Sequence, residues 1–236
     1  MPDPVALCFS GGKDSVLALQ ELRRDGRWHV VRLITTVTDA YDRVSMHGVR
    51  RSLLHSQAAS LGLPLTEVVV PPESSNAVYE RQMGHAFRAL RAEGLRHVAF
   101  GDIFLQDLRE YRERHLAEFE LDGVFPLWLA DTTSLARAFI EHEFHAIVVC
   151  VNASMLDRSF AGRAFDEAFL AALPEGVDPC GERGEFHTFV SDGPVFDRPI
   201  PFEVGATVDR AGFVFCDLRG HDDAAERPSS ASTRSA

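Results

Sequence analysis

Short apolar runs alternate with amphipathic segments along the first half of the chain. The runs that predict strands are 5–9, 30–34, 65–70 and 97–100. Residues 48–61 have a helical pattern, and Asn76 is a candidate cap for a helix whose apolar positions include Met83, Phe87 and Leu90. Repeated strand–helix units of this kind predict an α/β fold, with a parallel sheet that is flanked by helices.

The pattern changes beyond about residue 123. Helices are expected at 134–143 and 160–173, and a strongly apolar strand is expected at 146–151. From 175 onward glycine, proline and short alternating runs predominate, and 209–212 predicts a hairpin turn. We therefore expect a smaller C-terminal α+β region. The expected divisions are an α/β domain at 1–122, the α+β region at 123–220 and a disordered tail at 221–236.

Composition narrows the classes of protein that remain. The 236 residues are 45% hydrophobic and 25% charged, values that are ordinary for a globular protein. No apolar stretch is long enough to span a bilayer and the N-terminus lacks the features of a signal peptide, so a cytoplasmic protein without a membrane partner is expected. The net charge of −11 opposes nucleic-acid binding. The four cysteines lie far apart, which gives little support to a zinc site or a redox dithiol.

The most informative stretch is the hexapeptide S-G-G-K-D-S at residues 10–15, between the first apolar run and a helical segment. Glycines let backbone N–H groups approach a ligand, and a new helix adds free donors and the positive end of its dipole. The sequence therefore predicts an anion cradle. An ordinary glycine turn is the alternative. The Walker and dinucleotide glycine patterns both fail here, because Leu7 stands where the Walker loop needs its first glycine.

A second segment, Asp178–Thr188, reads D-P-C-G-E-R-G-E-F-H-T. By itself it is explained equally well as a ligand-binding loop and as a solvated turn before an edge strand. The hexapeptide matches the S-G-G-x-D-S loop of PP-loop ATP pyrophosphatases. With a downstream G-E-x-G-E-[FY]-x-T segment, the chain resembles the diphthine–ammonia ligase family of these N-type enzymes. Further resemblance lies in Gly101-Asp102-Ile103, Asp107, Arg109, Tyr111, Arg112 and Pro126-Leu127-Trp128.

The resemblance implies a Rossmann-like fold of the adenine nucleotide alpha hydrolase type, with ATP and Mg²⁺ as cofactors. The residues that it places around the phosphates are Ser10, Gly11, Gly12, Lys13, Asp14 and Ser15. Asp14 is the candidate metal ligand, and a purely electrostatic role at the helix N-terminus explains it equally well. Thr35 and Met46, with neighbours that include His47, would border adenine, or they could be packing residues.

The remaining expected site residues follow the strand at 97–100 or belong to the second segment. Asp102, Asp107 and Arg112 would line the cleft, although a solvated helix face accounts for 109–114 nearly as well, and Gly101 is expected to bind the cofactor. Lys13, Asp14, Asp102, Asp107, Glu182 and Glu185 are the expected catalytic residues. The residues expected to bind the acceptor or ammonia are Arg112, Gly181, Glu182, Gly184, Glu185, His187 and Thr188.

The activity implied by the resemblance is an ATP-dependent, AMP-forming amide ligase. A carboxylate of a small molecule or a protein would be adenylated with release of pyrophosphate, and ammonia would then displace AMP. The alanine- and arginine-rich composition suggests a bacterial source, and diphthamide belongs to elongation factor 2 of archaea and eukaryotes, so the acceptor stays open. A homodimer is left open as well. The alternatives are a tRNA sulfur-transfer enzyme, with Cys180 as the lone candidate thiol, and a nucleotide-binding sensor without turnover.

Overall fold

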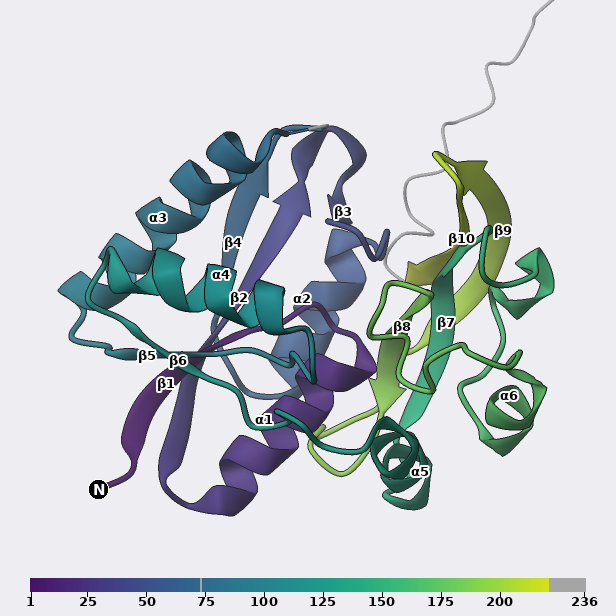
Figure 1. Cartoon of the computed structure of the whole chain (residues 1–236), viewed down its shortest axis with the longest axis horizontal. Helices are drawn as coiled ribbons and strands as arrows, with labels where there is room; N and C mark the ends of the chain where they lie inside the picture. Colours follow the sequence, from purple (N-terminus) through teal and green to yellow (C-terminus); the bar gives the residue numbers. More distant parts are fainter. Residues whose placement is uncertain (73, 221–236) are drawn as a thin grey trace, which may run out of the picture.

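The structure, a computed structural model, describes residues 1–72 and 74–220, so the expected tail at 221–236 lies outside it. Six strands form the first sheet (Figure 1). The strands are β1 (Asp3–Cys8), β2 (Trp28–Thr38), β3 (Arg43–Val44), β4 (Leu65–Val70), β5 (His97–Ala99) and β6 (Asp122–Val124). β1 lies between β2 and β5, β4 is on the far side of β2, and β6 is beyond β5. All pairings are parallel except that of the short β3 with β2.

Helices cover both faces of this sheet, as alternating side chains of β1 require. Val5 and Leu7 pack in one core with residues of α1 (Lys13–Asp25) and α2 (Arg51–Ser60). Ala6, between them, points to the other face, which is covered by α3 (Asn76–Ala92) and α4 (Gln106–Ala117). Burial of apolar groups on both faces explains why the strands read as nearly continuous apolar runs. The expected α/β class with a parallel sheet is confirmed.

The chain order places a topological switch point between β1 and β5. β2 and β4 lie on one side of β1, and β5 and β6 lie on the other side. In open α/β sheets a ligand binds in the crevice at such a point, beyond the carboxyl ends of the strands. The hexapeptide follows β1 and Gly101 follows β5, so both expected loops lie at this crevice.

A second sheet is antiparallel and has the order β8-β7-β10-β9. Its strands are β7 (His145–Asn152), β8 (Phe186–Asp192), β9 (Phe202–Arg210) and β10 (Phe213–Gly220). The helices of this part of the chain are α5 (Thr132–Glu141) and α6 (Glu167–Ala172). Short 3-10 turns occur at η1 (Asp39–Tyr41) and η2 (Arg158–Phe160). The second sheet packs against α1 and α2, and one hydrophobic core runs through both sheets. The division into two domains near residue 122 stays a prediction.

The helix expected at 160–173 is wrong over its first half, and only Glu167–Ala172 is α-helical. The backbone before it pairs with β7 instead, because the amides of Gly162 and Phe165 donate to the carbonyls of Val148 and Ala146 at 2.7 and 2.9 Å. The expected hairpin turn is confirmed between β9 and β10. Among the described residues, no helix is long and apolar enough to cross a membrane.

Candidate active site

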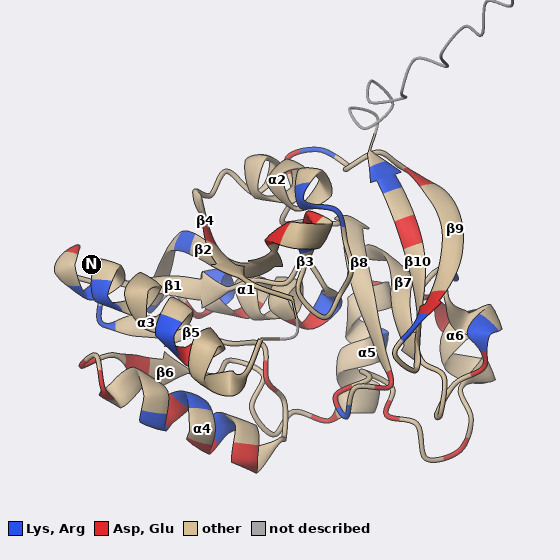
Figure 2. Ribbon diagram, turned by 90° about the horizontal axis from the view of Figure 1, so that it is seen from above, with Lys and Arg blue, Asp and Glu red and all other residues tan. Residues whose placement is uncertain are grey.

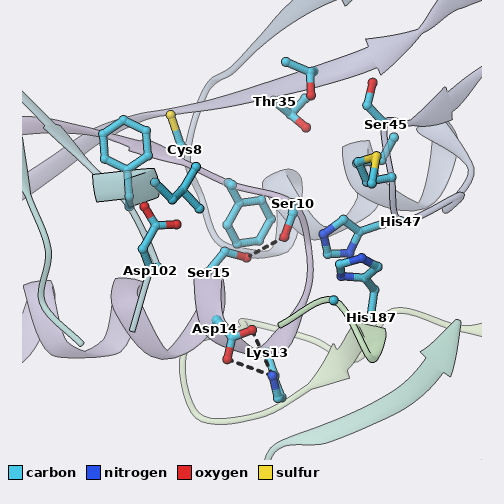
Figure 3. A pocket seen from close by; sticks show the side chains of 18 of the residues that line it. Cys8, Ser10, Lys13, Asp14, Ser15, Thr35, Ser45, His47, Asp102 and His187 are labelled. Carbon is cyan, nitrogen blue, oxygen red and sulfur yellow. Dashed lines mark hydrogen bonds and ion pairs between the residues drawn. The ribbon is translucent and has the colours of Figure 1, made fainter. Parts of the chain in front are cut away.

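A cavity of about 520 Å³ lies at the switch point. Its walls come from the loops after β1 and β5, from β2, from the segment after β3, from α3 and α4, and from the loop before β8 (Figure 3). The expected site residues that line it are Ser10, Lys13, Asp14, Ser15, Thr35, Met46, Gly101, Asp102, Arg112, Gly181, Glu182, Gly184, His187 and Thr188. Two sequence segments that lie more than 160 residues apart therefore form one cavity.

The glycines of the hexapeptide shape the backbone beneath this cavity. Gly11 has φ of +78°, and a Cβ atom there would lie 2.4 Å from Oε1 of Gln57. Gly12 is the N-cap of α1, and a Cβ atom there would lie 3.0 Å from Cε1 of His47 and 3.0 Å from the carbonyl oxygen of Thr188. The Ser15 hydroxyl donates to the Gly12 carbonyl at 2.8 Å. Close backbone approach and a helix N-terminus therefore meet at the hexapeptide, which is the geometry that an anion cradle requires.

Hydrogen bonds fasten the cradle to the second sheet. The backbone amide of Lys13 donates to Oγ1 of Thr188 at 3.0 Å, and the amide of Val190 donates to the Gly11 carbonyl at 2.9 Å. Gln57, which is fully buried in α2, donates from Nε2 to the carbonyls of Gly11 and Val190 at 3.0 and 2.6 Å. Sequence reasoning did not identify Gln57. A single amide on an amphipathic helix carries no signal of a partner 133 residues away.

The Lys13 side chain is 2% exposed and turns away from solvent. Its Nζ lies 2.8 and 2.9 Å from the two carboxylate oxygens of Asp14, and it also donates to the Cys180 carbonyl. The ring of Phe186 is 5.4 Å from the same nitrogen. Burial alone would lower the pKa of Lys13, but the Asp14 carboxylate and neighbouring acids hold it above its ordinary value. Lys13 is therefore charged and already paired with an acid of the same loop.

Glu182 joins the second loop to the segment after β5. Its Oε1 accepts a hydrogen bond from the Ile103 amide at 2.8 Å. Burial, together with the nearby carboxylates of Asp14 and Asp102, raises the pKa of Glu182 to about 7 despite that hydrogen bond. A carboxyl group with this pKa exchanges protons near neutral pH, as a general acid or base needs to do.

Two histidines form the wall beside the cradle (Figure 3). The rings of His47 and His187 are 4.5 Å apart, centre to centre, with an angle of 37° between their planes. Burial and the Lys13 charge lower the pKa of His187 to about 4, and burial and His187 lower the pKa of His47 well below its ordinary value. Both rings are neutral at pH 7. Nδ1 of His47 is buried and has no hydrogen-bond partner among the described residues.

Two of the other expected residues line the cavity as a pair, and two lie outside it. Arg112 pairs through two nitrogens with Asp102, and its Nη2 lies 3.1 Å from Oδ1. Asp107 is exposed in the first turn of α4, a helix with acidic and basic residues along its length (Figure 2), and it does not line the cavity. Glu185 is fully buried behind the loop, where its oxygens accept from the amides of Asp178 and Arg183 at 3.1 and 2.9 Å.

The fold is an α/β fold, and a cavity lies at its switch point beside the glycine turn and the N-terminus of α1. The chain matches the family models "Diphthamide synthase N-terminal domain" over residues 4–121 and "Diphthamide synthase C-terminal domain" over residues 131–214. It belongs to the diphthamide synthase family. The family membership expected from the two loops is therefore confirmed.

Similar curated proteins are diphthine–ammonia ligases. That of Danio rerio is 27% identical, and the match covers 89% of this chain and 90% of the relative. Those of Rattus norvegicus and Homo sapiens are each 26% identical, with 91% of this chain and 88% of each relative covered. These relatives support the expectation of an ATP-dependent ligase.

Replacing Gln57 by alanine tests the junction between the cradle and the second sheet. The Gln57→Ala variant loses both donated hydrogen bonds in a fully buried position and leaves a void, so we expect about 2–4 kcal/mol of lost unfolding free energy in urea. Gln106→Ala, at an exposed position in α4, is the control. If the two variants unfolded at the same urea concentration, the junction would contribute no stability.

Glu182 should make the protein less stable as the pH rises. A carboxyl group that titrates near 7 when folded, but near 4.5 when unfolded, leaves the native state with more bound protons between these values. Stability from this group is therefore present at low pH and is lost as pH rises from about 4.5 to 7, by on the order of 2 kcal/mol after discounting partial exposure.

Glu182→Gln keeps an oxygen acceptor for the Ile103 amide and removes the titration. We expect the difference in unfolding free energy between the native chain and this variant to change across that pH range. Glu118→Gln, an exposed change in the turn after α4, is the control. Parallel pH profiles for the native chain and Glu182→Gln would contradict the assignment.

Proposed function

We propose that the protein is an AMP-forming amide ligase, which activates a carboxylate with ATP and transfers it to ammonia. The observation that carries the proposal is the single cavity in which Thr188 of the second loop is bonded to the first amide of α1. That contact holds the two loops that carry the family resemblance at one cavity, which supports the proposal that they bind the same pair of reactants. Diphthine is the acceptor that the relatives' names state, and for this chain we propose only that the acceptor is a carboxylate.

The proposed reaction breaks two bonds in sequence. A carboxylate oxygen attacks the α phosphorus of ATP and the bond to the β-phosphate oxygen breaks, which releases pyrophosphate. The nitrogen of ammonia then attacks the acyl carbon, AMP departs and the nitrogen gives up a proton. The cradle at Gly11 and Gly12 would hold the departing pyrophosphate through backbone amides. Glu182, with its pKa near 7, would accept the proton.

The family resemblance implies Mg²⁺, and Asp14 could supply one carboxylate ligand for this ion. Among residues 1–72 and 74–220, no group of three or more His, Cys, Asp or Glu side chains could hold a metal alone. Mg²⁺ is usually held by one or two carboxylates together with substrate phosphates. Asp14 lines the cavity and would be the protein ligand of such an ion, whose charge would offset that of the phosphates.

Sulfur transfer is a weaker candidate on chemical grounds. It requires a thiolate beside the nucleotide, and burial raises the pKa of both Cys8 and Cys180 to about 12. The Cys180 thiol donates to the Thr132 carbonyl at 3.4 Å. Both thiols therefore stay protonated at neutral pH, when a thiolate is the form that reacts.

The products formed from ATP test the proposed reaction. Incubation with MgATP, ammonium and a panel of carboxylates should yield AMP and pyrophosphate in equal amounts, and their yield should depend on a carboxylate. Ion-exchange chromatography separates these products from ADP and phosphate. ADP and phosphate without AMP would exclude the reaction, whereas binding of ATP with no turnover would favour a sensor.

Gly12→Asp should abolish nucleotide binding, because the new side chain places a negative charge where Cβ itself would lie 3.0 Å from His47 and Thr188. The expected loss of ATP affinity is at least about 100-fold, which calorimetric titration would measure. Gly62→Asp is the control for added charge, since a Cβ atom there, after α2, has no neighbour within 4 Å, and Asp is among the residues that best tolerate the φ of +67° at this position. Unchanged affinity in Gly12→Asp would contradict the phosphate assignment.

A further inference from the structure

A second cavity, of about 480 Å³, lies beside the nucleotide cavity. It is enclosed between the segment from η1 to Gly48 and the hairpin of β9 and β10, the elements that face each other in Figure 1. Val44, Ser45 and Met46 line both cavities and form the wall between them. Each cavity has a volume within the range of small-molecule sites. A ligand in the second cavity would therefore lie directly beside one in the first.

The walls of the second cavity are mostly apolar, and the cavity is partly open to solvent. Tyr41, Met46 and Val208 are 42%, 69% and 56% exposed, and they are three of the few large apolar side chains that the described chain exposes. Phe213 and Phe215 extend the same surface. A contiguous patch of solvent-exposed apolar side chains marks a site for a ligand or partner, whereas single exposed apolar side chains do not. This surface favours a ligand with an aromatic or aliphatic body.

The polar groups around the second cavity are mostly paired with one another. Asp217 lies 2.9 Å from Arg43 and 2.9 Å from Arg50, so its carboxylate is compensated. The guanidinium of Arg210 lies 3.9 Å from the centre of the Tyr41 ring. The Asp217 carboxylate is thus neutralised by two arginines, and the Arg210 guanidinium covers an aromatic ring. An apolar body can therefore occupy this cavity without facing the Asp217 carboxylate unpaired.

The wall between the cavities has a constrained backbone. Met46 has φ of +66°, which is unusual for a residue other than glycine. Next to His47, Gly48 approaches β10 so closely that a Cβ atom there would lie 2.7 Å from the Phe215 ring. Backbone strain of this kind persists where the surrounding structure enforces it, and it concentrates at ligand sites. The close contact keeps Met46 at the boundary of both cavities.

We propose that the second cavity binds the apolar body of the acceptor, whose carboxylate reaches past Met46 into the nucleotide cavity. The inference rests on the proposed function, because only that reaction requires a carboxylate beside the α phosphate of ATP. The acceptor class is then an aryl- or alkyl-substituted carboxylate. A small hydrophilic acid would leave the exposed Tyr41, Met46 and Val208 without a partner.

The test compares 4-phenylbutyrate with butyrate, which lacks the ring. Binding to the full chain is measured by NMR titration in the presence of an ATP analogue that carries a methylene bridge between the α and β phosphorus atoms. We expect 4-phenylbutyrate to bind at least about tenfold more tightly than butyrate. Val208→Asn and, separately, Tyr41→Ser should each weaken 4-phenylbutyrate about fivefold or more without changing the affinity for the analogue.

Val204→Asn is the matched control, because Val204 is also exposed on β9 but does not line the cavity. Equal affinities for the two probes, or equal losses in Val204→Asn and Val208→Asn, would overturn the inference. AMP formation from carboxylates without ring-dependent binding would overturn it as well and would leave the proposed ligase reaction standing. Ring-dependent binding without AMP from any carboxylate would instead support the ligand class and exclude the reaction.

Discussion

The structure depends most on the buried hydrogen bonds that join the glycine cradle to the second sheet. The Gly11 carbonyl accepts from both Gln57 and the Val190 amide, and Lys13 donates its amide to Thr188. Moving any one of these elements would leave buried polar groups unpaired, at a cost of about 1–3 kcal/mol for each group. The cradle therefore has a fixed shape before a ligand arrives. A fixed set of backbone donors stabilises charge without reorganisation, which is the basis of electrostatic catalysis.

The cations of the nucleotide cavity are already neutralised by acids, although its proposed ligand is an anion. Lys13 pairs with Asp14, Arg112 pairs with Asp102, and the chain as a whole carries a net charge of −11. Attraction for phosphate must then come from local backbone amides and the N-terminus of α1. The site would recognise a phosphate chain by shape and directed hydrogen bonds more than by net charge. Local donors of this kind would let a protein with a net charge of −11 bind the proposed nucleotide although its overall charge opposes anions.

Sequence patterns predicted the parts of the fold that local rules determine. The alternation of apolar runs placed the strands, and the glycine hexapeptide at a strand end placed the cradle at the switch point. Contacts between distant segments were not predictable in this way. Gln57 and the pairing of His47 with His187 were missed because each depends on a partner from another element. The helix expected at 160–173 was wrong for the same reason, since β7 competes for its backbone.

The short antiparallel strand β3 of the first sheet lies between the two cavities that the proposed reaction uses. β3 joins β2 beyond the end of β1, and the residues that follow it form the wall shared by both cavities. The cradle is fastened through Gln57 and Thr188, which do not line the second cavity. Substitutions in the β9–β10 hairpin, which lines the second cavity and not the first, can therefore change which acceptor fits and leave the phosphate cradle intact. On this argument the chain separates acceptor choice from nucleotide binding by assigning them to different elements.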